Sequence, residues 1–258
     1  LVPIIGVVVL IYGVMGGLEA AYFTDLIQGS CIILLSLLLI PFGLNELSAQ
    51  FGGEGMLDGF RIMHEQLPPE AFSVVGSTSA SEFPIYFIVA TVLINLIGVV
   101  VQPHFIATGG GSAKTETVAR VGLVTGNFLK RFCTVGWVLT ALIALALYAD
   151  SAVLIDDPDK VWGFASRELL GPGLTGLMLA CLLAALMSSV DAYMVVGSGL
   201  VARNIYAPYI NPNASEKTYL KVARYTGTVI VAGAVIISLF MMDVFKQLEL
   251  TWVFPAII

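Results

Sequence analysis

The sequence predicts an all-α protein that crosses a membrane several times. Of its 258 residues, 58% are hydrophobic and only 12% are charged, whereas soluble domains carry roughly 25% charged residues. The apolar residues also gather in runs close to the ~20 residues that a helix needs to cross a bilayer. Because a water-soluble core does not need such runs, we expect a single polytopic membrane domain over residues 1–258.

Apolar runs of this kind recur along the whole chain. We expect membrane spans at about 1–15, 19–44, 83–107, 123–149, 173–205, 220–242 and 248–258. A break at Gly16-Gly17 separates the first two. The chain opens at Leu1 within one apolar run and stops at Ile258 within another, so we expect an internal fragment of a larger polytopic protein.

Charged residues predict the orientation of these spans. The long connections 45–82 and 150–168 are mainly acidic, whereas the connections on the opposite side are basic. That side holds 8 of the 12 Lys and Arg residues: Lys114, Arg120, Lys130, Arg131, Arg203, Lys217, Lys221 and Arg224. The positive-inside rule places it in the cytoplasm. We therefore expect a multi-pass protein of the cell membrane, which in a bacterium is the inner membrane.

The sequence carries no motif of a nucleotide-binding or hydrolytic enzyme. It has no phosphate-cradling loop, no nucleophile elbow and no HExxH. The net charge of −6 argues against a nucleic-acid partner, and no basic motif contradicts this. Cys31, Cys133 and Cys181 lie within apolar runs without the spacing of a metal site or a disulfide framework. We therefore expect neither an enzyme nor a nucleic-acid-binding protein.

The span at 173–205 contains polar residues at its centre. Ala185, Ser188 and Ser189 are three and four residues apart, so they share one face of a helix. That face offers a backbone carbonyl and two hydroxyls, which are the oxygen ligands that hard cations prefer. Asp191 follows directly, and an ionisable residue within a span indicates a functional site. Alternatively, small polar residues line a helix–helix contact, with hydroxyls bonded to the carbonyl four residues earlier.

A second group of polar residues interrupts the span at 83–107. Asn95, Gly98, Gln102, Pro103 and His104 follow one another there. Polar residues and Pro at membrane depth predict a discontinuous helix, unwound near 95–98, and in transporters such a helix marks the substrate cavity. The alternative is a simple Pro kink, with Gln102 and His104 near the cytoplasmic interface.

Three stretches of the chain resemble a known family. They are YGVMGGLEAAYFTDLIQG at 12–29, VVVQPHFIA at 99–107 and AALMSSVDAYMVVGSGLVARNIY at 184–206. In this order and spacing they are similar to the sodium:solute symporters, which include sodium–glucose, sodium–proline and sodium–sialic acid transporters. Asn204 stands where that family usually has Asp. The resemblance implies a LeuT-type fold of two inverted repeats, of which this chain would hold core helices four to nine and the start of ten.

The same resemblance implies a sodium site. The family's conserved sodium ligands match Ala185, through its carbonyl, and Ser188 and Ser189, through their hydroxyls. Asp25 matches an Asp near the inner exit path of the ion. We therefore expect sodium as the coupling ion, with the solute in a cavity formed by Asn95, Gly98 and Gln102.

Two positions depart from the family pattern. Some members bind a second sodium with two hydroxyls, and Asp191 and Ala192 stand at those positions. It stays open whether Asp191 replaces a ligand or carries a proton. The aromatic inner gate of the sugar transporters is also absent, because Val99, Val100 and Val101 occupy its place. The identity of the solute is therefore open.

The activity that the resemblance implies is secondary active transport. We expect sodium-coupled symport of a small organic solute by alternating access, in a protein surrounded by the lipid bilayer. The alternative is a symporter-like membrane domain that acts as the sensor of a signalling protein. A kinase core downstream of Ile258 would favour that alternative.

Overall fold

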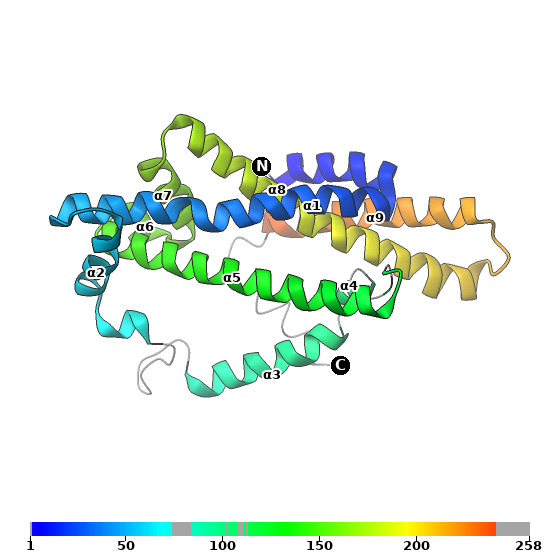
Figure 1. Ribbon diagram of the computed structural model, residues 1–258. Helices are drawn as coiled ribbons and strands as arrows, with labels where there is room; N and C mark the ends of the chain where they lie inside the picture. Colours follow the sequence, from blue (N-terminus) through cyan, green and yellow to red (C-terminus); the bar gives the residue numbers. More distant parts are fainter. Residues whose placement is uncertain (1, 74–83, 102, 108–110, 112, 241–258) are drawn as a thin grey trace. The chain divides into compact units, whose positions relative to one another are not determined.

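Every regular element of the structure, a computed structural model, is a helix (Figure 1). The structure describes residues 2–73, 84–101, 103–107, 111 and 113–240, except the side chains of 12, 14–20 and 99–101. Within these residues there is no β-strand. The predicted all-α class is therefore confirmed.

Five long helices form most of the fold. They are α1 (Val2–Phe51), α3 (Ile85–Val101), α5 (Glu116–Tyr148), α8 (Pro172–Leu200) and α9 (Glu216–Phe240). A π-helix, η4 (Val201–Ile210), continues α8. The short elements are α2 (Met56–Gln66), η1 (Pro69–Phe72), α4 (Pro103–Phe105), α6 (Ala152–Asp156), η3 (Pro158–Lys160) and α7 (Val161–Leu169).

Within the described residues, four helical stretches are long and apolar enough to cross a bilayer. They are Ala21–Phe51, Glu116–Tyr148, Pro172–Ile210 and Glu216–Phe240. Large apolar side chains on these helices are exposed, including Phe23, Phe128 and Phe240. In water such surfaces would be unfavourable, whereas lipid covers them at no cost. The protein is therefore a multi-pass membrane protein. The last expected span, 248–258, lies outside the described residues.

α1 is longer than the apolar run that predicted it. Helical residues continue without a gap from Val2 to Phe51, through Gly16-Gly17 and past the expected end at 44. Figure 1 shows the ribbon changing direction within α1, after its dark-blue first part. Pro41 removes one helical hydrogen bond, at a cost of ~3 kcal/mol. Leu44 and Leu47 beyond it are fully buried in the apolar core of the fold, and their packing supports the helix past Pro41.

The expected unwinding near 95–98 is wrong. α3 is helical through Asn95 and Gly98 and ends at Val101. A single Gly costs only ~1 kcal/mol in a helix, so Gly98 alone does not break it. Pro103, which lacks an N–H, instead begins α4. Gln102, between the two helices, lies outside the described residues.

The chain folds as two compact units. Unit 1 comprises Leu1–Ser30, Ile94–Val124 and Leu183–Ile258, and unit 2 comprises Cys31–Leu93 and Thr125–Leu182. The core of unit 1 joins Ile5 and Val9 of α1 to Met194 of α8 and Val231 of α9. Unit 1 therefore contains the parts of α1 and α8 on which the predicted ion-site residues lie.

Unit 2 has its own apolar core, to which α1, α2, α5, α7 and the start of α8 contribute. One cluster contains Leu35, Leu39, Ala144, Ala165, Leu170, Met178 and Cys181, and a second contains Leu44, Leu47, Ile62, Met63, Leu67 and Ile143. A Cβ at Gly136 of α5 would overlap the carbonyl oxygen of Ser36 on α1. The absence of a side chain at Gly136 thus lets the two helices approach closely.

Candidate functional site: a cluster of oxygen donors on α8 and α1

Two of the predicted sodium ligands contact each other on α8. The Ser189 hydroxyl donates a hydrogen bond of 3.3 Å to the carbonyl oxygen of Ala185. Ala185 is half-buried and Ser189 is exposed. The helical spacing of four residues brings these two oxygens together, as the sequence predicts. The same contact is the hydroxyl-to-carbonyl bond of the alternative, so this pair alone does not distinguish a cation site from a helix contact.

The third predicted ligand reaches across to α1. The Ser188 hydroxyl donates a 2.6 Å hydrogen bond to Oδ1 of Asp25, a residue 163 positions earlier in the chain. At 2.6 Å, a hydrogen bond from a hydroxyl to a carboxylate is strong and charge-assisted. Both side chains are half-buried in unit 1. The tertiary structure therefore joins the serine pair to the acid that the family resemblance placed on the ion path.

Asp191 is buried without a partner. Its side chain is 0% exposed, and neither carboxylate oxygen has a hydrogen-bond partner among the described residues. Ser188 and Asp191 are three residues apart on α8 and so share a face, and the carboxylates of Asp191 and Asp25 are close enough to interact electrostatically. Two acids and one hydroxyl thus meet at one place in unit 1.

Gly13 of α1 covers this acid. A Cβ added at Gly13 would lie 2.8 Å from Oδ1 of Asp191 and would overlap Cε of Met194. Only a residue without a side chain lets α1 approach α8 so closely. Gly13 is not among the residues predicted from the sequence, and the one signal that points to it is its place in the Gly-rich run 12–17.

Another unpartnered oxygen lies on α1. Gln28 is 8% exposed, and its Oε1 has no hydrogen-bond partner in the part of the chain that the structure describes. Gln28 follows Asp25 by three residues, so the two side chains share a face of α1. Buried polar atoms are almost always paired, and Gln28 and Asp191 are exceptions within the same unit.

The predicted solute-cavity residues are only partly described. On α3, Asn95 is exposed and Gly98 is buried. Gln102 and the side chains at 99–101 lie outside the described residues, so the missing aromatic gate is not tested. His104, expected near the interface, is half-buried, and its ring lies 4.7 Å from that of Tyr193 on α8.

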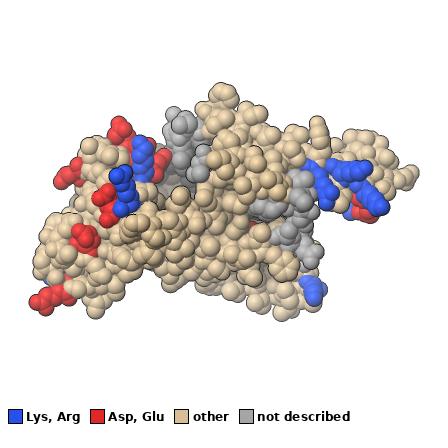
Figure 2. All heavy atoms as spheres, turned by 90° about the horizontal axis from the view of Figure 1, so that it is seen from above, with Lys and Arg blue, Asp and Glu red and all other residues tan. Residues whose placement is uncertain are grey.

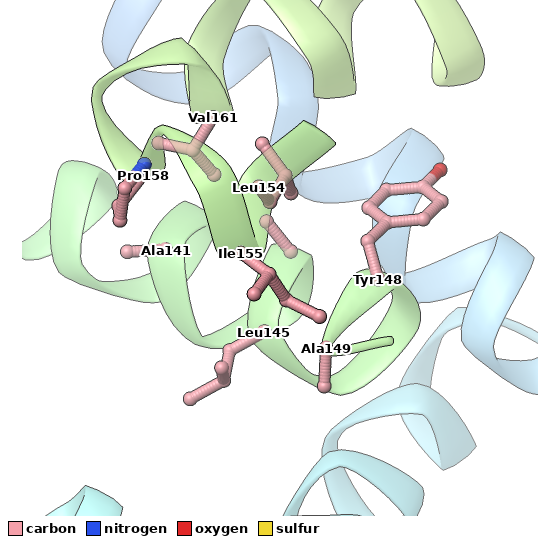
Figure 3. A pocket seen from close by; sticks show the side chains of 9 residues that line it. Ala141, Leu145, Tyr148, Ala149, Leu154, Ile155, Pro158 and Val161 are labelled. Carbon is pink, nitrogen blue, oxygen red and sulfur yellow. The ribbon is translucent and has the colours of Figure 1, made fainter. Parts of the chain in front are cut away.

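A separate hollow of about 360 Å³ lies in unit 2, between the end of α5 and the short helices α6, η3 and α7 (Figure 3). Its lining is apolar apart from the Tyr148 hydroxyl and contains none of the predicted site residues. Within the described residues no group of three or more His, Cys, Asp or Glu could hold a metal ion. The oxygen donors near Ser188 are of the chemical kind that hard cations bind.

The fold and this cluster define a class: a helical membrane protein with oxygen donors and acids inside its spans. A family model described as the sodium:solute symporter family matches residues 2–255. The chain therefore belongs to the sodium:solute symporter family.

Several curated proteins are similar to this chain. The osmoregulated proline transporter OpuE of Bacillus subtilis is 26% identical over 232 residues, which cover 90% of this chain and 44% of that protein. Sodium/glucose cotransporter 4 of Danio rerio is 25% identical, with 88% and 37% covered. The human high affinity choline transporter 1 is 26% identical, with 91% and 40% covered. The chain thus spans less than half the length of these relatives.

Proposed function

We propose that the protein carries out sodium-coupled symport of a small organic solute by alternating access. The observation that carries this proposal is the 2.6 Å hydrogen bond between Ser188 and Asp25, because it joins the predicted sodium ligands to the predicted ion path. Membership of the family supports it, as do the names of the relatives, which are transporters of proline, glucose and choline.

The proposed sodium site consists of the Ala185 carbonyl and the hydroxyls of Ser188 and Ser189. In the present arrangement each hydroxyl donates its hydrogen to another oxygen of the cluster. Rotation of the two hydroxyls would turn their lone pairs toward a cation. Three oxygens are fewer than a hard cation takes, so further oxygens from water or the rest of the protein would complete the shell.

A second ion position is proposed between Asp25 and Asp191. The burial of Asp191 without a hydrogen-bond partner supports it, since an uncompensated buried charge is costly. A cation between the two carboxylates, with the Ser188 hydroxyl as a further ligand, would remove that cost. The number of coupled ions then depends on whether both positions fill together.

The proposed transport cycle uses a LeuT-type inverted-repeat fold, with seven spans as expected from the sequence and the cytoplasm on the basic side. Sodium would favour one state of the protein, and solute in a cavity near Asn95, Gly98 and Gln102 would favour closure. Coupling requires each ligand to bind the two states with affinities that differ by ~1–3 kcal/mol.

Transport, not catalysis or sensing, is the proposed role. The named relatives are transporters, which favours transport over a sensor domain. In a bacterium the protein would lie in the inner membrane. The coupling ion would be sodium.

The test is the binding of radioactive sodium to the purified protein, which needs no knowledge of the solute. The double change Ser188→Ala/Ser189→Ala should raise the dissociation constant for sodium at least about tenfold, or ~1.4 kcal/mol. The control is Ser198→Ala, because Ser198 also lies on α8 and bonds only the Val195 carbonyl. Unchanged sodium affinity in the double variant would overturn the site.

A further inference from the structure

Three basic side chains near the start of α9 face the same way. Lys217, Lys221 and Arg224 are four and three residues apart, so they lie on one face of the helix. All three are exposed. None of them forms an ion pair within the described part of the chain. The ion pair nearest to them in the sequence joins Arg203 and Glu216. We call these three residues the basic face.

The acid at the start of α9 is already paired with a cation outside this face. Glu216 accepts a 3.0 Å bond from Nη2 of Arg203, and the Arg203 guanidinium lies 5.2 Å from the centre of the Tyr219 ring. The Tyr219 hydroxyl in turn donates to the carbonyl oxygen of Asn211 at 3.1 Å. These contacts brace η4 against α9 and pair Glu216 with Arg203, and none of the ion pairs among the described residues joins an acid to the three basic side chains.

The charge is visible on the surface. Figure 2 shows blue side chains gathered around one red group at the end where, by its place in Figure 1, the turn between η4 and α9 lies. Because the chain as a whole has a net charge of −6, a local excess of positive charge is not a general property of its surface.

The basic face lies at the start of α9, and α9 is long and apolar enough over Glu216–Phe240 to cross a bilayer. The start of such a helix is expected at the level of the lipid headgroups. Tyr225 next to the face is 75% exposed, and Leu220 within it is 51% exposed. Tyr is enriched at the level of the lipid headgroups, where long Lys and Arg side chains extend to the phosphates. The partner within reach of these cations is therefore a lipid headgroup.

We propose that Lys217, Lys221 and Arg224 form a binding face for the headgroup phosphate of an anionic phospholipid. A zwitterionic lipid carries a compensating cation, whereas an anionic lipid presents a net negative charge to three positive ones. Each basic residue near a charged membrane surface contributes an attraction that corresponds to about fivefold in affinity. The face thus selects lipids by net charge.

The experiment measures how many phosphatidylglycerol and phosphatidylcholine molecules stay bound to the purified protein from mixed micelles, by native mass spectrometry. We expect the protein to retain phosphatidylglycerol over phosphatidylcholine, less so as salt is raised. The triple change Lys217→Gln/Lys221→Gln/Arg224→Gln should lower the preference by roughly fivefold for each charge removed. Soluble glycerol phosphate should not displace the lipid, which separates headgroup binding in a membrane from binding of free phosphate.

A charge-matched control tests whether the face itself matters. The exchange Lys221→Ala/Ala223→Lys with Arg224→Thr/Thr226→Arg keeps the composition and net charge of α9 but moves two cations about half a turn around the helix, away from Lys217. We expect it to lose most of the preference. The proposal is overturned if this exchange retains the preference in full, if the triple variant does, or if Lys130→Gln/Arg131→Gln on α5 abolishes it equally.

Discussion

Asp191 is the residue whose surroundings least match its chemistry. Its carboxylate is fully buried on α8, close to a second acid, Asp25, and has no hydrogen-bond partner among the described residues. Gly13 of α1 lies directly against it. Leaving a buried charge unpaired costs several kcal/mol, and proteins keep such residues where a ligand compensates them. The surroundings of Asp191 therefore support the proposed ion position.

The change Asp191→Asn tests the proposed ion binding, because it removes the charge and keeps the size and shape of the side chain. In sodium-free buffer the variant should melt at a higher temperature than the native protein, because an uncompensated buried charge is removed, a gain of about 1–3 kcal/mol. The rise in melting temperature on adding sodium should become smaller, because a ligand stabilises only the folded state that binds it. Thermal unfolding with and without sodium measures both effects.

The control is Asp156→Asn, since Asp156 is exposed on α6. This variant should melt like the native protein and keep the full response to sodium. If sodium stabilises Asp191→Asn as much as it stabilises Asp156→Asn, Asp191 does not bind the ion.

Gly13 offers a second test at the residue scale. In Gly13→Ala the added methyl group meets the Asp191 carboxylate and overlaps Met194, and overpacking of this kind costs about 1–3 kcal/mol. Gly29→Ala on the same helix meets nothing within 4 Å and should be neutral or slightly stabilising, since Ala is the better helix former. Equal melting temperatures for the two variants would contradict the close approach of α1 to α8.

At the scale of elements, a polar contact ties α5 to α1 within unit 2. Nε1 of Trp137 donates a 2.6 Å hydrogen bond to the Ser36 hydroxyl, which itself donates 2.7 Å to the Ile32 carbonyl. The hydroxyl is thus satisfied in both directions although Ser36 is 0% exposed. Hydrogen bonds between membrane helices are worth about 0.6 kcal/mol on average, so this one orients the two helices more than it holds them.

A double-mutant cycle with Trp137→Phe and Ser36→Ala measures this contact. Ser36→Ala should be the more destabilising single change, because it leaves the Trp137 N–H without an acceptor. The coupling energy should be close to 0.6 kcal/mol. Fully additive losses in the free energy of unfolding would show that the two side chains do not interact.

At the scale of the whole molecule, the distribution of charge predicts orientation. Basic residues cluster in the first turns of α9, and the long connections after α1 and after α5 are acidic. The positive-inside rule concerns Lys and Arg in short connections, and the segment around the basic face is of that kind. We therefore expect the turn between α1 and α2 outside the cell and the turn between η4 and α9 inside it.

Single cysteines test this orientation. In a variant in which Ala replaces Cys31, Cys133 and Cys181, the exposed positions Glu54 and Asn213 are each changed to Cys. A membrane-impermeant maleimide should label Glu54→Cys in intact cells, and Asn213→Cys only after the cells are permeabilised. The opposite pattern would invert the orientation and remove the cytoplasmic leaflet as the source of the lipid at the basic face.

The class of the protein and the place of its polar residues within the spans follow from the order of residues along the chain. Apolar runs of near-bilayer length can hardly form anything but membrane helices, because an unsatisfied backbone in lipid is prohibitive. The helical spacing of Ala185 and Ser189 likewise predicts their contact, since it depends only on local geometry. Rules based on neighbouring residues predict structure least well where burial opposes them. Pro41, for example, does not end α1.

Only the tertiary structure decided what surrounds these residues. Ser188 bonds to Asp25, and Gly13 lies against Asp191, whose carboxylate has no hydrogen-bond partner among the described residues. Each of these contacts joins segments that are more than 160 residues apart in the chain. No periodicity in the chain encodes such contacts, because they depend on which faces of α1 and α8 pack together. Helix identity is set by neighbours along the chain, whereas the environment of a buried acid is set by neighbours in space.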